Sequence, residues 1–102
     1  MSLSTHVLDT ATGRPAPGVP VALHRRDGAG WTELAAASTD ADGRARLTEE
    51  QLAAADHRLV FDTGARGGFY PEVVVTFRPG PVAHLHVPLL LSPYGYSTYR
   101  GS

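Results

Sequence analysis

Hydrophobic and polar residues alternate along much of this chain, and Pro, Gly and Asp interrupt the alternation about every ten residues. A period of two is typical of a strand that turns one face to a core and the other to solvent. Val19, Val21 and Leu23 show this period clearly. Short strands separated by frequent turns indicate an all-β protein, and we interpret the chain as a sandwich of two sheets.

The pattern predicts eight short strands. They cover residues 3–9, 19–23, a segment beginning near 31, then 44–47, 59–61, 73–77, 83–91 and 96–102. An Asp-Gly turn at 27–30 separates the strand at 19–23 from the one beginning near 31, and a second turn at 40–43 leads into the strand at 44–47. The only stretch typical of a helix is 48–55, where Thr48 and Gln51 have the spacing of a capping box, so we expect one or two helical turns there.

Length and composition limit the function classes. The 102 residues fit a single domain over 1–102, and 42% hydrophobic with 19% charged residues is typical of a globular protein. The absence of Cys excludes disulfides, thiolate metal sites and cysteine nucleophiles. A net charge of −1 without a basic patch argues against nucleic acid as a partner.

No membrane segment is expected, because the longest aliphatic run, 87–91, is too short to cross a bilayer. The first residues lack the basic and apolar regions of a secretory signal, so we expect a cytoplasmic protein. The last strand, 96–99, is rich in aromatic and β-branched residues. Because a small core and open sheet edges favour association, we expect this strand to pair with another subunit.

The five histidines are the first candidates for chemistry, because histidine titrates near neutral pH. On the strand 83–87, a period of two places His84 and His86 together on the polar face. His6 faces away from the apolar side of its own strand. The simplest interpretation of this spacing is the polar face of a half-solvated strand, and a zinc site of His6, His84 and His86 is the alternative.

Arginines and the C-terminal residues are the other candidates. Arg44 and Arg46 share one face of a strand, and a guanidinium suits lactam carbonyls and oxyanions; we expect Arg46 to be a solvated surface residue. The segment Tyr99–Ser102 directly follows a strand, so it is either a free stub or the wall of a pocket. A nucleophilic hydroxyl at Ser102 would need an adjacent base.

Three parts of the chain together resemble one known family. They are STHVLD at 4–9 with TGRPA at 12–16, TDADGR at 39–44, and HLHVPLLLSPYGYSTYRGS at 84–102. These segments resemble the 5-hydroxyisourate hydrolases, the transthyretin-like enzymes of urate breakdown, over nearly the whole chain. The final Tyr-Arg-Gly-Ser separates the enzyme from the hormone carrier transthyretin.

The resemblance implies a transthyretin-like sandwich of eight strands that assembles as a homotetramer, a dimer of dimers, without metal or cofactor. Its active sites would lie at the interface between dimers. The resemblance gives catalytic roles to His6, Arg44 and His86, and substrate-binding roles to Tyr99, Arg100, Gly101 and Ser102. His84 matches a position that is often histidine but is not usually given a catalytic role.

One segment departs from the family pattern. Relatives usually carry the single helix of the fold between residues that match 61–63 and 70–72, and here only 64–69 remain. We therefore expect this helix to be missing or reduced to a turn.

The resemblance also implies a reaction, the hydrolysis of 5-hydroxyisourate to 2-oxo-4-hydroxy-4-carboxy-5-ureidoimidazoline. We expect His6 and His86 to activate a water that attacks a ring amide, Arg44 to stabilise the oxyanion and Arg100 to help bind the substrate. Direct attack by a serine hydroxyl, such as that of Ser102, is the second version of this mechanism. The rival function is a non-catalytic carrier of a small ligand, which predicts an apolar channel.

Overall fold

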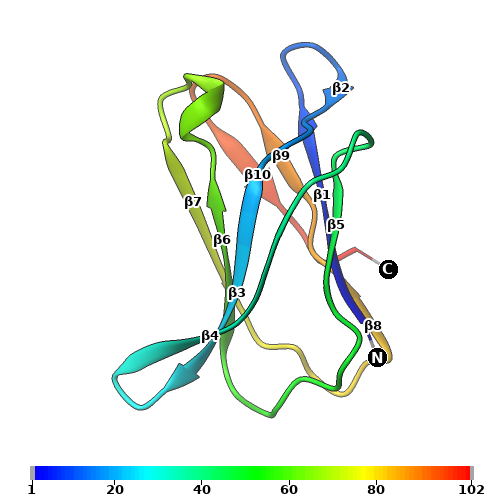
Figure 1. The fold of residues 1–102 in the computed structure, drawn as a ribbon, viewed down its shortest axis with the longest axis vertical. Helices are drawn as coiled ribbons and strands as arrows, with labels where there is room; N and C mark the ends of the chain where they lie inside the picture. The colour runs from blue at the N-terminus through cyan, green and yellow to red at the C-terminus, as the bar shows by residue number, and fades with distance from the viewer. Residues whose placement is uncertain (1, 102) are drawn as a thin grey trace.

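Strand β1, Ser2–Asp9, is the centre of the larger sheet in the computed structural model, which describes residues 2–101 (Figure 1). The first half of β1 lies between antiparallel β5 and parallel β8, and its second half lies between antiparallel β2 and parallel β9. The last strand, β10, pairs with β9. The bounds of these partners are Arg14–Pro15 for β2, Arg44–Thr48 for β5, His84–His86 for β8, Leu89–Leu91 for β9 and Tyr96–Thr98 for β10.

The smaller sheet consists of four antiparallel strands in the order β4, β3, β6 and β7. Figure 1 shows it as the second layer of the sandwich, with the hairpin of β3 and β4 extending beyond the larger sheet. The bounds of these strands are Pro20–Asp27 for β3, Gly30–Ser38 for β4, His57–Asp62 for β6 and Glu72–Phe77 for β7. The predicted two-sheet sandwich is therefore confirmed.

The core lies between the two sheets and follows the predicted period of two. Leu3 and Val7 of β1 are fully buried, and they belong to the same cluster as Leu23, Leu59 and Phe61 of the smaller sheet. Residues at the intervening positions of β1 face outward and are partly exposed. One face of the larger sheet is thereby left free to carry polar side chains.

The predicted number of strands is wrong, because residues 2–101 form ten. The two-residue strand β2 lies in a segment that we expected to be a loop, and the strand expected over 83–91 is divided into β8 and β9. Pro88 has no N–H for a ladder hydrogen bond. At the same point, the buried Thr5 hydroxyl donates to the Val87 carbonyl at 2.6 Å, so the break is stabilised by a side chain. The final strand also ends earlier than expected, at Thr98, with one further bridge at Gly101.

The helix expected at 48–55 is absent from the structure. Thr48 belongs to β5 and pairs with Leu3 of β1, so the extended backbone of the sheet continues through the proposed cap position. Its hydroxyl accepts the N–H of Glu50 at 3.0 Å, which forms a tight turn in place of a helix start. Pairing in the sheet therefore overrides the local helix signal.

The short segment that replaces the family helix forms a single 3-10 turn, Gly64–Arg66, as predicted. Arg66 donates to the carboxylate of Asp9 at 2.9 Å, and the Phe69 N–H donates to the Pro93 carbonyl at 2.7 Å. These contacts tie the turn to the far end of β1 and to the loop before β10. Between residues 2 and 101, no helix is long and apolar enough to span a membrane.

Thr39 provides a test of how the loops are tied to this sandwich. Its buried hydroxyl donates to the Ala16 carbonyl at 2.7 Å and accepts the Val19 N–H at 2.9 Å. Replacing Thr39 with Val keeps the shape but leaves two buried backbone groups unpaired, so we expect the free energy of unfolding to fall by about 3 kcal/mol in urea denaturation.

The matched control is Thr39→Ser, which keeps the hydroxyl and loses one methyl group. We expect it to cost about 1 kcal/mol. Equal losses in the two variants would contradict the role given to the hydroxyl.

Candidate active site

A tight turn places Arg44 at the start of β5. The Asp40 carboxylate accepts the N–H groups of Asp42 and Arg44 at 2.9 and 3.0 Å, and the Asp40 N–H donates to the Arg44 carbonyl at 2.8 Å. Gly43 completes the turn with φ of +75°, a conformation that favours glycine. Its carbonyl accepts the Val7 N–H at 2.7 Å, so the turn is fixed directly onto β1.

Three neighbouring strands then bring the predicted catalytic residues onto one face. Arg44 of β5 is the direct cross-strand partner of His6 on β1, and His86 of β8 is the partner of Ser4, two residues before His6. Leu3 and Thr5 point into the core, so Ser4 and His6 point outward. His6, Arg44 and His86 therefore share the outward face of the larger sheet.

A serine holds each histidine of β8. The Ser4 hydroxyl lies 2.9 Å from Nδ1 of His86, and the Ser2 hydroxyl lies 2.8 Å from Nδ1 of His84. The parallel register of β1 and β8 creates both pairs, because the same offset matches each serine with one histidine. The His86 pair is the more buried of the two.

The C-terminal segment lies against His86. The Gly101 N–H donates to the His86 carbonyl at 2.7 Å, and the two residues form an isolated antiparallel bridge. A Cβ atom at Gly101 would lie 2.8 Å from Cδ2 of His86, so a larger residue would push the ring aside. Figure 1 shows the chain after β10 reaching the half of the sheet that holds β8.

The electrostatics of the face keep His86 neutral. Burial lowers the pKa of His86 below the ordinary histidine value, and the positive charges of Arg44 and His6 lower it further, although a hydrogen bond with the Ser4 backbone opposes the change. A neutral imidazole next to a guanidinium can accept a proton while the arginine stabilises negative charge.

The space in front of these groups is small and open. A hollow of about 160 Å³ lies over the strands at Ser4, Arg44 and His86, and a neighbouring hollow of about 310 Å³ extends towards Ser2 and His84. A larger hollow of about 500 Å³ lies elsewhere, between the loops 51–56 and 78–81, and no histidine lines it. We take the hollow of about 160 Å³ as the candidate site because Ser4, Arg44 and His86 line it; His6 shares this sheet face but does not line the hollow.

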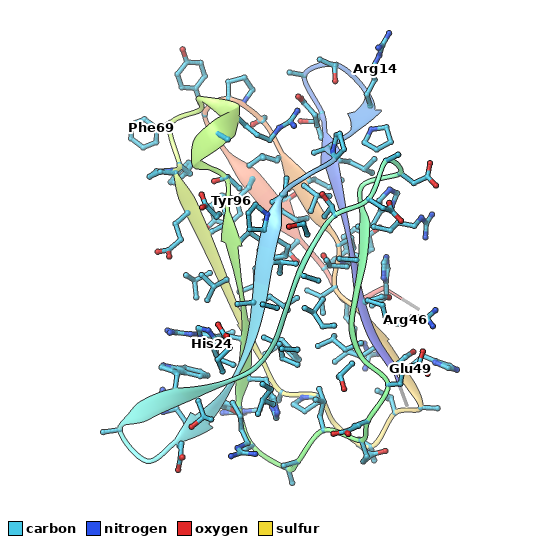
Figure 2. The ribbon with its side chains drawn as sticks, in the orientation of Figure 1. Arg14, His24, Arg46, Glu49, Phe69 and Tyr96 are labelled. Atoms are coloured by element: carbon cyan, nitrogen blue, oxygen red, sulfur yellow. The ribbon has the colours of Figure 1, made fainter. Side chains whose placement is uncertain are left out.

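The structure does not bring every predicted site residue into this hollow. Gly101 contacts His86, whereas Tyr99 is 58% exposed and Arg100 is also exposed. Ser102 lies outside the described residues. Arg46 is exposed as predicted and its guanidinium lies 2.6 Å from the Glu49 carboxylate (Figure 2), but it also lines the hollow on the side of β5.

Sequence reasoning missed Ser4. Its place on the same face as His6 can be read from the alternation in β1, but its contact with His86 depends on a parallel pairing between segments 82 positions apart. No three His, Cys, Asp or Glu side chains among residues 2–101 are grouped to hold a metal ion. His6, His84 and His86 therefore do not form the alternative zinc site within the described chain.

Comparisons with known proteins place these residues in context. The profile of the HIUase/Transthyretin family matches residues 3–101. A 5-hydroxyisourate hydrolase of Caulobacter vibrioides is 51% identical over 112 aligned positions, which cover 98% of this chain and 97% of that protein. The aligned length exceeds the 102 residues of this chain, so the relative carries residues that are missing here.

Solved structures of two kinds share the fold. The Klebsiella pneumoniae 5-hydroxyisourate hydrolase has a TM-score of 0.85 and 40% identity, with all of both chains covered. Sea bream transthyretin in complex with thyroxine has a TM-score of 0.87 and 34% identity, with 97% of this chain and 93% of that chain covered. Fold similarity alone therefore does not separate a hydrolase from a carrier, and the side chains of the site must do so.

The neutral state of His86 can be tested by following its ring signals in NMR as the pH is varied. We expect its titration midpoint below the ordinary histidine value, and we expect Arg44→Gln to raise it, because one neighbouring positive charge is removed. The midpoint should stay below the ordinary value, since burial is the largest cause of the shift. The unfolded chain binds this proton more readily, so His86 destabilises the fold as the pH falls through the ordinary histidine range.

Arg46→Gln is the matched control for this titration, because Arg46 lies on the same strand but is paired with Glu49. We expect it to leave the His86 midpoint almost unchanged. A wild-type midpoint at or above the ordinary histidine value would contradict the electrostatic description of the site.

Proposed function

Since the chain belongs to the HIUase/Transthyretin family, we propose that it hydrolyses 5-hydroxyisourate in the breakdown of urate. The observation that carries the proposal is the convergence of His6, Arg44 and His86 on one outward sheet face. Two imidazoles and a guanidinium can activate water and stabilise an oxyanion without help from a metal. Relatives that are about half identical to this chain are 5-hydroxyisourate hydrolases.

In the proposed mechanism, a neutral His86 accepts a proton from water while His6 helps to orient that water. The water oxygen bonds to C6 of the ring, and the carbonyl electrons move onto the oxygen, where Arg44 stabilises the charge. The bond between N1 and C6 then breaks, and the proton held by the imidazole passes to N1. The product is 2-oxo-4-hydroxy-4-carboxy-5-ureidoimidazoline. Stabilisation of the oxyanion by Arg44 contributes about 3 kcal/mol to lowering the barrier.

The C-terminal residues complete the proposed pocket. Gly101 lies against His86, and we propose that Tyr99, Arg100 and Ser102 bind the substrate next to it. Arg100 supplies a second cation for the lactam carbonyls of the substrate. We favour water over the Ser102 hydroxyl as nucleophile, because a neutral His86 beside Arg44 can activate water directly.

The carrier function is the alternative, and the thyroxine complex of sea bream transthyretin is the reason to consider it. A site for a large apolar ligand needs apolar walls. The walls here are imidazole, guanidinium and hydroxyl groups at His86, Arg44 and Ser4, which favours a small polar ring.

We also propose that the protein works as a homotetramer built from two dimers. The support for assembly is that the site lies on an outward sheet face and that its hollow is open, so a second copy would be needed to exclude water. The outer edges of β7 and β10 have no partner strand within residues 2–101, and such edges can pair with another subunit.

The hydrolase function is tested by generating 5-hydroxyisourate with urate oxidase and following its decay in the ultraviolet. We expect the wild type to exceed the spontaneous rate clearly. Replacing His86 with Ala should lower kcat about 100-fold or more, because the proton acceptor is lost, and Arg44→Gln should lower it by a similar factor.

Arg78→Gln should keep most of the activity and controls for the loss of a surface charge, because Arg78 is exposed, pairs with Asp56 and does not line the hollow. Ser102→Ala should leave much of the rate, whereas an abolished rate would support direct attack by serine. If the wild type does not accelerate the decay, the proposed function is wrong.

The assembly is tested by replacing a residue on each outer sheet face with a charge. Leu90 lies on the same outward face as the site, and a glutamate there would be buried between dimers. In sedimentation experiments we expect four chains per particle for the wild type and two for Leu90→Glu, with lower activity per chain. Val74→Glu, on the outer face of the other sheet, should stay at four chains. A wild type that sediments as a single chain would overturn the proposal.

A further inference from the structure

We infer that Ser4 is a positioning residue for His86: its hydroxyl holds Nδ1 of the imidazole so that Nε2 is presented to the reacting water. This inference rests on the proposed function, because it gives a purpose to one bond in the proposed site. The family resemblance includes Ser4 in its first matching segment but gives it no role, and its contact with His86 emerges only from the pairing of β1 with β8.

The position of the Ser4 hydroxyl is tightly determined. Ser4 is paired on one side with Arg46 of β5 and on the other with His86 of β8. Its own carbonyl accepts the Val87 N–H at 3.0 Å, which fixes the backbone next to the histidine. The sheet therefore holds the backbones of Ser4 and His86 in place before substrate binds. Because of this, the 2.9 Å contact between the hydroxyl and Nδ1 costs little conformational entropy in the reaction.

The chemistry of a base requires a particular arrangement of protons in this pair. An imidazole that accepts a proton through Nε2 must carry its own proton on Nδ1. The Ser4 hydroxyl then accepts the Nδ1–H hydrogen bond, and this bond favours the productive tautomer and ring orientation. As His86 gains charge during the reaction, the same bond becomes charge-assisted and stabilises the imidazolium.

Gly101 restrains the ring from the other side. The C-terminal backbone lies so close that a Cβ atom at residue 101 would be 2.8 Å from Cδ2 and 3.2 Å from Cβ of His86. The ring therefore has a hydrogen bond at Nδ1 and little free space next to Cδ2, while Nε2 carries no hydrogen bond to residues 2–101. Removing the Ser4 hydroxyl would release one of the two restraints.

The chain offers a matched control for this test. The Ser2 hydroxyl lies 2.8 Å from Nδ1 of His84, which is the same kind of bond, made by the same two strands, at a more exposed position. His84 has no role in the proposed mechanism. Ser2→Ala therefore removes an equivalent hydrogen bond without touching the proposed base.

The experiment compares Ser4→Ala, Ser4→Thr and Ser2→Ala with the full-length wild type. We expect Ser4→Ala to lower kcat about tenfold or more with little change in KM, because the bond acts on the reacting geometry and makes no direct contact with substrate. Ser4→Thr keeps the hydroxyl and should restore most of the rate. Ser2→Ala should stay within about twofold of the wild type.

A second measurement does not depend on the reaction. Proton–nitrogen NMR of the free protein should show His86 mainly as the Nδ1–H tautomer in the wild type and in Ser4→Thr, and as a mixture in Ser4→Ala. Wild-type kcat in Ser4→Ala, an equal loss in Ser2→Ala, or an unchanged His86 tautomer in Ser4→Ala would each overturn the inference. If the wild type itself fails to hydrolyse 5-hydroxyisourate, the proposed function fails, and the tautomer measurement still decides whether Ser4 positions the ring.

Discussion

The pairing of strand β1 along both of its edges is the constraint on which the rest of the structure depends. Its buried positions build the core with the opposite sheet, and its backbone bonds to four different segments fix where each of them lies. The outward positions of the same strand carry Ser4 and His6. A single extended segment therefore supplies both the stability of the sandwich and the frame of the site, so a shift in its register would disturb both at once.

Local pattern was sufficient to predict the two-sheet architecture, because most strands carry their own signal, although the two-residue β2 does not. Alternation located the strands, and the Asp-Gly turn at 40–43 located the start of β5. The prediction of a helix at 48–55 failed because local propensity has no information about the sheet pairing that holds Thr48 extended. The division of the strand at Pro88 was visible in the sequence, but the hydroxyl of Thr5 that bonds to Val87 was not.

The site could be predicted only in part, because its residues come from strands that are far apart in the sequence. Spacing placed His84 and His86 on one strand face and offered His6 as a third zinc ligand, but only the family resemblance added Arg44 and gave His6 and His86 a shared catalytic role. Physical reasoning from one chain cannot read which distant strands pair, and the Ser4 contact depends entirely on that pairing. The exposure of Tyr99 and Arg100 follows from the early end of β10, since the chain leaves the sheet after Thr98 and touches it again only at Gly101.

The position of strand β8 has one further consequence, because its two edges pair with segments from opposite parts of the chain. Ser2 pairs with His84 on one side, and Gly101 bridges His86 on the other. Residues 2 and 101 therefore both lie beside the strand that carries His86. A fluorescent label or fusion partner joined at either end would crowd this face, whereas the hairpin tip at 28–29, far from β8, offers an attachment point that leaves it clear.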